Sequence, residues 1–469
     1  MSREVRRRRG YAAAQDLLSC GIRSTGVLDF NRLQTALNEV IRRHAAFTTT
    51  ISPNLHLPTA EWNNQLLEFA RTGVFSSGIY VQYESSTDPI AIRRVDMRSV
   101  SVERQDEQIR QLLQCEHDKP FDYARPPFAR AVLVTLSSDD HLLIVVVDHL
   151  ISDEWSLQII CREITSLYEC GGVADSHLPM PMTSYSEHAK WEQLMIASNG
   201  FAGEKDFWER RWQEFAVDRI AFQQLPFYSP QPNNHSAKCA RVCMRLGAEF
   251  GDALRRAASE QGTTVFVMLW VAYVIVLSHY TGRSRLAIWT HLANRSRRDV
   301  RDTVGFFVNT HLIGLDMSDD PCVDALLSRA QMHVLESLLH ERMPLQFLWN
   351  ATGGPPRLND ASLLVDYLSL MPNRRRERTI HSSSIGRVEL PNVSVPRWSS
   401  LGLYGVERPS GLTLTIQYSV SRFSNTMAGQ LIIDVHQVLT SLIAEPSRCV
   451  SSFRTLVHPY PHTARSAAS

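Results

Sequence analysis

A histidine surrounded by carboxylates lies where an apolar segment gives way to a helical pattern. The stretch "VVVDHLISDEWSLQII", residues 145–160, contains Asp148, His149, Asp153 and Glu154. A neutral imidazole can take the proton of an attacking alcohol or amine, because its pKa lies near neutrality. Asp153 follows His149 by about one helical turn, where its carboxylate can fix the turn by pairing with an arginine from elsewhere. These residues predict a general base, His149, supported by Asp153.

A plainer interpretation of the same residues stays open. An aspartate ahead of a helix is often only an N-cap, and a glutamate in the first turn is favoured by the helix dipole. A histidine at the end of a buried strand is often a structural residue. The spacing of His149 and Asp153 alone does not decide between the two interpretations.

Two strands and a helix are predicted to position this stretch. "PFARAVLVTL" (127–136) and "HLLIVVVD" (141–148) are apolar runs separated by "SSDD", which is typical of a hairpin whose second strand is buried on both faces. From Ser156 the apolar residues follow a helical period. The "GG" at 171–172 marks a boundary. Other predicted helices include 30–47, capped by Asp29, and 247–260.

Composition excludes several classes of function. The net charge of +1 does not favour nucleic acid, and no glycine-rich phosphate loop is present. The eight cysteines are scattered, which predicts no metal site and reduced thiols in a cytoplasmic protein. We expect no signal peptide. The apolar run 265–277 is too short to span a bilayer, so we predict a buried core helix and no membrane association.

The length of 469 residues exceeds what one hydrophobic core normally serves. We predict an α/β (α+β) protein with an N-terminal lobe at 1–175, linker helices and a loop at 176–236, and a C-terminal lobe at 237–469.

The chain resembles the condensation domains of nonribosomal peptide synthetases over nearly its whole length. The stretch 125–169 is similar to that family's strand, acidic turn, second strand and HHxxxDG motif, followed by "WS" and a helix ending in "LY". "LQTALNEVIRRHAAFTTTI" looks like an early family helix. "LANRSRRDVRDTVGFFVNTHLI" is similar to its "NR…IGFFVNTL" block. The combination of "GFFVNT" with HxxxD makes the resemblance specific.

The resemblance implies two chloramphenicol-acetyltransferase-like lobes in a V-shaped pseudo-dimer with a central tunnel. His149 matches the catalytic histidine and Asp153 the motif aspartate, so the resemblance places both among the catalytic residues, with Arg295 as the candidate partner of Asp153. The resemblance also places Glu154, Trp155, Ser156 and Asn309 along the substrate tunnel. A backbone-bonding role for Asn309 and a solvated surface position for Arg295 stay open.

Two positions depart from the family motif. Asp148 stands where the motif has its first histidine, and could orient the imidazole or raise its basicity. Glu154 stands where the motif has glycine, and we hypothesise that it shapes the acceptor pocket and disfavours an acceptor with a nearby carboxylate. Asp148 and Asp153 also fit the DxxxxD pattern of heterocyclization domains, but His149 is retained between them. The order Trp155-Ser156 differs from that of epimerization domains.

The resemblance implies a free-standing condensation enzyme of natural-product biosynthesis. It would transfer an acyl or aminoacyl group from a carrier-protein phosphopantetheine thioester to the hydroxyl or amine of an acceptor. The carrier would act in trans, the acceptor would be a small molecule or carrier-bound, and no bound cofactor is expected. Two alternatives stay open: an inactive condensation-like domain that recruits partner proteins, and a coenzyme A-dependent acyltransferase.

Overall fold

The structure is a computed structural model that describes residues 17–53, 80–84, 88–122, 125–171, 178, 180–215, 225, 239–344, 363–369, 385–391 and 401–458. The chain divides into two compact units, neither of which is continuous in sequence. Unit 1 comprises 1–200, 293–308 and 379–396, and unit 2 comprises 201–292, 309–378 and 397–469.

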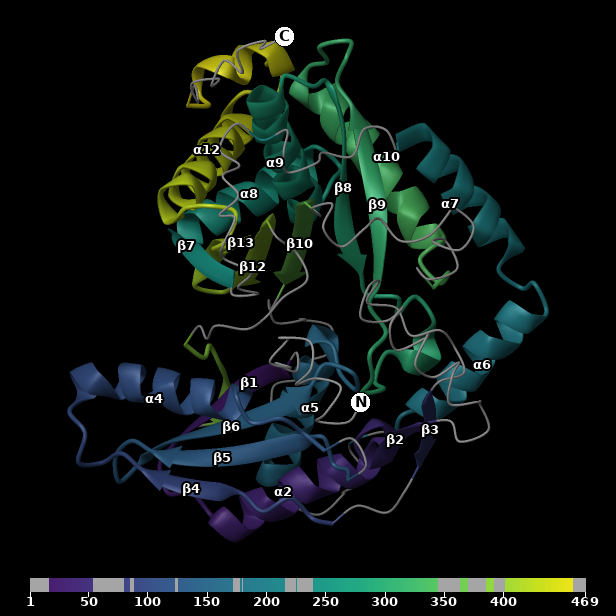
Figure 1. Cartoon of the computed structure of the whole chain (residues 1–469). Coiled ribbons are helices and arrows are strands. Elements are labelled where there is room, and N and C mark those ends of the chain that lie inside the picture. The colour runs from purple at the N-terminus through teal and green to yellow at the C-terminus, as the bar shows by residue number, and fades with distance from the viewer. Residues whose placement is uncertain are drawn as a thin grey trace. The chain divides into compact units, whose positions relative to one another are not determined.

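Unit 1 is built on a five-stranded sheet with the strand order β11-β1-β6-β5-β4 (Figure 1). The strands are β1 (Leu17–Thr25), β4 (Arg93–Asp96), β5 (Ala129–Thr135), β6 (Asp140–Asp148) and β11 (Ile385–Val388). The predicted hairpin is present as β5 and β6, which pair antiparallel. A separate two-stranded sheet consists of β2 (Thr49–Pro53) and β3 (Tyr80–Glu84).

The central strand β6 is buried on both faces, as its uninterrupted apolar sequence predicts. Its alternate residues Leu143, Val145 and Val147 pack in one cluster with α2 (Phe30–Arg43) and α5 (Glu154–Glu169). Leu142, Ile144 and Val146 pack on the other face with α4 (Val102–His117). A strand covered on both faces is a rigid support for the turn that follows it.

The other helices among the described residues of unit 1 are α6 (Tyr185–Ala197) and the short 3₁₀ turns η1 (Ala45–Thr48) and η4 (Arg298–Val300). Ser184 and Glu187 form a capping box at the start of α6. Asp29 caps α2 through the backbone N–H of Arg32, as predicted.

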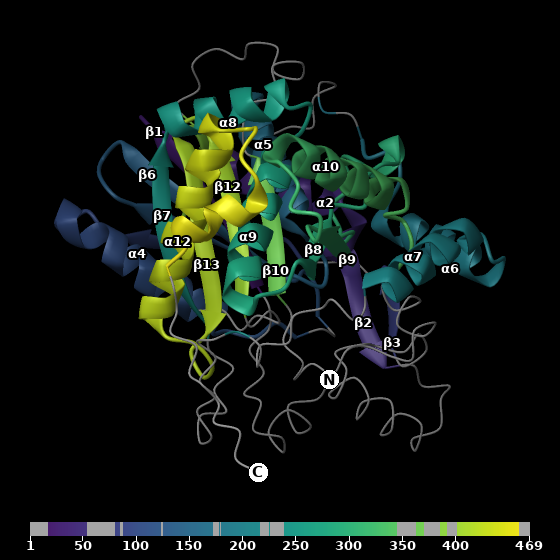
Figure 2. The ribbon, with the colours of Figure 1, turned by 90° about the horizontal axis from the view of Figure 1, so that it is seen from above.

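Unit 2 contains a six-stranded sheet with the order β7-β13-β12-β10-β8-β9. Its strands are β7 (Cys239–Gly247), β8 (Arg285–Leu292), β9 (Asn309–Asp316), β10 (Leu363–Ser369), β12 (Leu401–Arg408) and β13 (Gly411–Ser419). One face is covered by α8 (Ala248–Glu260), α9 (Val265–Thr281), α10 (Val323–Leu339) and α12 (Asn425–Ala444), as Figure 2 shows. On the other face, Phe215 of α7 (Ala202–Phe215) packs in a cluster with Trp289 and Leu312.

The predicted core helix at 265–277 is α9, whose residues from Val267 to Leu277 are all buried. Among the described helices, α12 has the length and composition of a membrane span, but 56% of that window is buried within the protein. Helices α8 and α9 meet the same criterion only if joined, and they cross at 95°. Both α9 and α12 contribute to the main cluster of unit 2, so we describe them as core helices.

The predicted boundaries at 175 and 236 assumed that each lobe is continuous in sequence. Each compact unit instead combines three separate stretches of the chain. The linker helices fall in different units, α6 in unit 1 and α7 in unit 2. The predicted loop at 223–236 lies outside the described residues except for Leu225. The V-shaped arrangement and the tunnel concern the placement of the lobes, and both stay predictions.

Candidate active site

The candidate site is the turn between β6 and α5, in unit 1 (Figure 1). The strand ends at Asp148 and the helix begins at Glu154. Asp148 is buried, and its Oδ1 accepts the backbone N–H of Leu150 at 2.9 Å. The hydroxyl of Ser152 donates to the Asp148 carbonyl at 3.0 Å. Asp148 and Ser152 therefore hold the backbone of the turn.

The imidazole of His149 is fixed by a backbone carbonyl. Its Nδ1 lies 2.7 Å from the carbonyl oxygen of Ser152, and because a carbonyl can only accept, Nδ1 carries a hydrogen. The ring also meets Phe306 edge-to-face, with centroids 5.2 Å apart. In the neutral ring Nε2 then holds the lone pair. Within the described part of the chain, no residue bonds to Nε2. The partly exposed ring is thus oriented as a proton acceptor.

The carboxylate of Asp153 is completely buried and holds two parts of the chain together. Its Oδ1 accepts the backbone N–H and the hydroxyl of Ser156, each at 2.7 Å, so Asp153 is the N-cap of α5. Arg295 Nη2 lies 3.0 Å from Oδ1 and 3.1 Å from Oδ2. The backbone N–H of Phe307 donates to Oδ2 at 3.1 Å. The sequence left open whether Asp153 caps the helix or pairs with an arginine. In the structure it does both.

Arg295 is buried and connects the turn to residues 300–305. Its Nη1 donates to the carbonyls of Val300 and Thr303, both at 2.8 Å. Its guanidinium lies over the ring of Phe307, 4.1 Å from the centroid. Burial lowers the pKa of Arg295, while Asp153 opposes that shift. The group stays charged, because an arginine pKa lies far above neutrality. A solvated position for Arg295 is therefore wrong.

Ser156 completes the link between α5 and the segment 293–308. Its buried hydroxyl accepts the backbone N–H of Gly305 at 3.1 Å and lies 2.9 Å from the Gly305 carbonyl. Gly305 has no room for a side chain, since a Cβ would lie 2.2 Å from Tyr185. The hydroxyl of Tyr185 donates to the Phe306 carbonyl at 2.9 Å.

Glu154 begins α5 and pairs with Arg387 of β11. Arg387 Nη2 lies 2.6 Å from Glu154 Oε1. Burial lowers the pKa of Arg387, but Glu154 and the neighbouring thiols of Cys161 and Cys20 outweigh it and raise the pKa overall. The hypothesis that Glu154 shapes the acceptor pocket and disfavours an acceptor with a nearby carboxylate did not include this ion pair, and it stays a prediction.

The last two predicted residues lie in different units. Trp155 is partly exposed, and its Nε1 donates to the Arg301 carbonyl at 2.9 Å within unit 1. Asn309 begins β9 in unit 2, and its Nδ2 donates to the carbonyls of Glu341 at 2.7 Å and Met343 at 3.2 Å. Asn309 thus has the backbone-bonding role that was the alternative to a tunnel position.

Three sequence assignments need correction. Asp153 was placed among the catalytic residues, but its buried and fully bonded carboxylate positions the turn instead. Ser156 was placed along the substrate tunnel, but it is buried in the same network. Asp148 was expected to orient the imidazole or to raise its basicity. The carbonyl of Ser152 orients the ring, and Asp148 bonds to the backbone of Leu150. An effect of Asp148 on the basicity of His149 stays a prediction.

Three contributors to the site were not predicted from the sequence: the Ser152 carbonyl, Phe306 and Arg387. The "GFFVNT" block was a usable signal for Gly305, Phe306 and Phe307, because it was already singled out as part of the resemblance. Nothing in the pattern around Arg387 pointed to Glu154, which lies 233 positions earlier in the chain.

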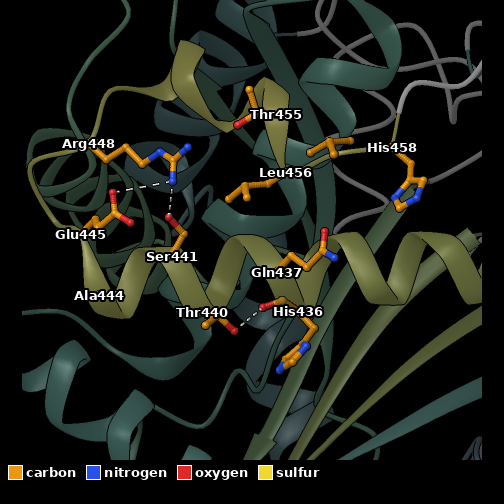
Figure 3. A pocket seen from close by; sticks show the side chains of 11 residues that line it. His436, Gln437, Thr440, Ser441, Ala444, Glu445, Arg448, Thr455, Leu456 and His458 are labelled. Atoms are coloured by element: carbon orange, nitrogen blue, oxygen red, sulfur yellow. Dashed lines mark hydrogen bonds and ion pairs between the residues drawn. The ribbon is translucent and has the colours of Figure 1, made fainter.

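A pocket of about 650 Å³ lies elsewhere, between α12 and η5 (Val450–Thr455) in unit 2 (Figure 3). Arg448 on its wall is engaged by Ser441 at 3.1 Å, Ser452 and Glu445. None of the predicted site residues lines this pocket. Among the described residues, no group of three or more His, Cys, Asp or Glu side chains could hold a metal ion.

The chain was compared with known proteins. A family model described as "Condensation domain" matches residues 71–458. Malpinin synthetase from Mortierella alpina is 26% identical over 369 residues, which are 78% of this chain and 5% of that protein. The chain therefore spans a small part of the length of this curated relative.

Two solved structures share the fold. SgcC5 from Streptomyces globisporus superposes with a TM-score of 0.72 at 21% identity, covering 92% of this chain and 93% of the other. The X-domain from teicoplanin biosynthesis, solved in complex with OxyB, gives a TM-score of 0.70 at 20% identity, with coverages of 93% and 90%. The predicted α/β fold of the chloramphenicol-acetyltransferase type is confirmed.

Proposed function

The chain belongs to the condensation domain family, and we propose that it transfers an acyl or aminoacyl group from a carrier-protein phosphopantetheine thioester to the hydroxyl or amine of an acceptor. The single observation that carries the proposal is the imidazole of His149. Its Nδ1–H is fixed on the Ser152 carbonyl, and its Nε2 lone pair is directed away from that contact.

Each step of the proposed reaction uses this nitrogen. The acceptor oxygen or nitrogen attacks the thioester carbonyl carbon while Nε2 takes its proton, and the new C–O or C–N bond forms. The C–S bond then breaks, and the proton held by the imidazolium passes to the departing thiolate. The products are an ester or amide and the free thiol of the carrier arm, so atoms and charges balance.

Two carboxylates near His149 are already paired with arginines. The carboxylate of Asp153 is paired with Arg295, and that of Glu154 with Arg387. Neither Asp153 nor Glu154 therefore forms a permanent ion pair with His149. Holding donor and acceptor together would then supply much of the acceleration.

A carrier protein in trans and a free or carrier-bound acceptor are part of the same proposal. That the chain works as a free-standing enzyme in the cytoplasm stays a prediction. A coenzyme A thioester is the alternative donor, and competition between an acyl-carrier thioester and the matching acyl-coenzyme A distinguishes them.

The second candidate is partner recruitment without catalysis. It is favoured by the fold similarity to the X-domain that was solved in complex with OxyB, and by the departures at Asp148 and Glu154 from the motif. The intact His149, Asp153 and Arg295 arrangement favours catalysis, since recruitment alone does not require an oriented imidazole.

The test is to incubate the protein with acyl-carrier thioesters and a panel of amines and alcohols, and to identify products by mass spectrometry. The proposal predicts a new ester or amide that depends on His149. Absence of any condensed product over the panel, together with capture of a partner enzyme that is unaffected by His149→Ala, would favour recruitment instead.

A further inference from the structure

The start of α5 is tied to two later parts of the chain that are distant from each other in sequence. Asp153 bonds to Arg295 and Phe307, and Trp155 bonds to the Arg301 carbonyl, so both reach the segment 293–308. Glu154, between them, bonds instead to Arg387 on β11. Among the described hydrogen bonds of these three side chains, the Glu154 bond is the one that joins the turn to the sheet edge.

The sheet holds Arg387 in a defined place. β11 pairs antiparallel with β1, and Arg387 is opposite Ile22, which is buried in the core of unit 1. β1 in turn pairs with β6 along its whole length, and Leu17 lies opposite Asp148. Arg387 is thus anchored through two strands to the strand that precedes His149, while its guanidinium holds the helix that follows His149.

The ion pair is close in sequence to the bond that aims the imidazole. Glu154 lies two residues after Ser152, whose carbonyl receives the His149 Nδ1–H at 2.7 Å. A shift at the first residue of α5 would therefore move this carbonyl and turn the imidazole. Small displacements of a reacting group have large effects on rate.

The pair is poorly placed to serve global stability. The Glu154 and Arg387 side chains are 43% and 24% exposed, and ion pairs accessible to solvent contribute little to folding. Glu154 accepts from Arg387 Nη2, while Arg387 Nη1 is buried and has no bond within the described residues. An interaction of this kind affects local geometry more than it affects unfolding.

We propose that Arg387 is a positioning residue for the transfer reaction, acting through Glu154 to hold the turn that orients His149. The inference rests on the proposed function for its kinetic consequence, but the orientation of the imidazole can be measured without turnover. Glu154, which occupies the motif's glycine position, is then part of the contact that holds the turn.

The experiment compares Arg387→Gln, Glu154→Gln, Arg387→Lys and the exchanged pair Glu154→Arg with Arg387→Glu. Arg23→Gln is the matched control, because Arg23 is also a sheet arginine paired with a carboxylate, Asp140, but lies away from the turn. The readouts are kcat and KM for acyl transfer, the pH profile of kcat, the melting temperature, and the ring ¹⁵N signals of His149, assigned by their loss in His149→Ala.

We expect Arg387→Gln and Glu154→Gln to lower kcat by about tenfold or more, with KM nearly unchanged. The melting temperature should move by less than about 2 °C. The Nδ1–H tautomer signal of His149 should weaken in both variants. Arg387→Lys and the exchanged pair should recover most of the loss, and Arg23→Gln should match the wild type in every readout.

Unchanged kcat and unchanged ring signals in Arg387→Gln would overturn the proposal. So would a loss of activity that follows a general loss of stability and is not recovered by the exchanged pair. If the wild type transfers no acyl group, the proposed function fails, and the ring signals alone then decide whether Arg387 positions the imidazole.

Discussion

At the scale of single residues, the site depends on a carboxylate that never needs to meet a substrate. Asp153 satisfies a helix N-terminus, a buried guanidinium and the backbone of Phe307 at once. The sequence could predict its partner, because Arg295 lies in the "ANR" segment of the resemblance. It could not predict the Ser152 carbonyl that aims His149, since backbone contacts carry no signal in residue type.

The buried pair of Asp153 and Arg295 should be far more important for stability than exposed pairs. Asp153→Asn should destabilise unit 1 by about 3–5 kcal/mol, because it leaves the Arg295 charge buried without compensation. Urea unfolding followed by fluorescence measures the change. Asp140→Asn, which breaks the more exposed pair with Arg23, should cost about 1 kcal/mol or less. Equal costs for both variants would contradict this assignment.

At the scale of elements, β6, the turn and α5 were predictable because each has a strong local pattern. β6 is continuously apolar, and α5 repeats its apolar residues with a helical period. β11 was not predictable, since four residues, "IGRV", carry no periodic signal and their pairing with β1 is set by tertiary contacts. Arg387 was missed for the same reason.

The packing of α6 against the segment 293–308 depends on a glycine. Gly305→Ala should destabilise unit 1 by about 1–3 kcal/mol, because the added methyl group would overlap Tyr185 and Phe307. Thermal unfolding measures the effect. Gly429→Ala in α12 is the control: nothing lies within 4 Å of its added methyl group, and alanine favours helix by roughly 0.5–1 kcal/mol. An unchanged stability in Gly305→Ala would contradict this prediction, because it would show that Tyr185 and Phe307 move aside at little cost.

At the scale of the whole chain, each compact unit is completed by segments distant in sequence. Unit 1 receives 293–308, which carries Arg295 and Phe306, and 379–396, which carries Arg387. The two-lobe organisation could be expected from length and from the resemblance. Composition and periodicity could not predict that 293–308 and 379–396 belong to unit 1, because neither property indicates which unit a short segment packs in.

Buried histidines should make the stability of the chain depend on pH. His311 is stacked on Trp208 with ring centroids 4.0 Å apart, and burial lowers its pKa to about 3. The unfolded chain takes up this proton near pH ~6.5. Below that pH the unfolded state binds more protons, so stability should fall as pH decreases toward 3.

His311→Phe tests this dependence. In the wild type, His311 should lower the unfolding free energy by up to about 1.4 kcal/mol for each unit by which the pH falls between its unfolded and folded pKa values. The variant should lack this contribution. Urea unfolding at a series of pH values measures it. Burial lowers the pKa of His188 to about 4 and raises the pKa of Glu192 to about 7. These two groups change the pH dependence of stability in opposite directions, and they do so equally in the wild type and in His311→Phe. Identical slopes of unfolding free energy against pH in the wild type and in His311→Phe would contradict a neutral, buried His311.

The most direct test of the account is the rate of acyl transfer by His149→Ala, measured with an acyl-carrier thioester and an acceptor that the wild type uses. Because Nε2 is the proton acceptor, the account predicts a loss of about 10²–10⁴-fold in kcat. Thermal unfolding should remain close to that of the wild type, since the ring is partly exposed. Transfer at the wild-type rate by a folded His149→Ala protein would contradict the account.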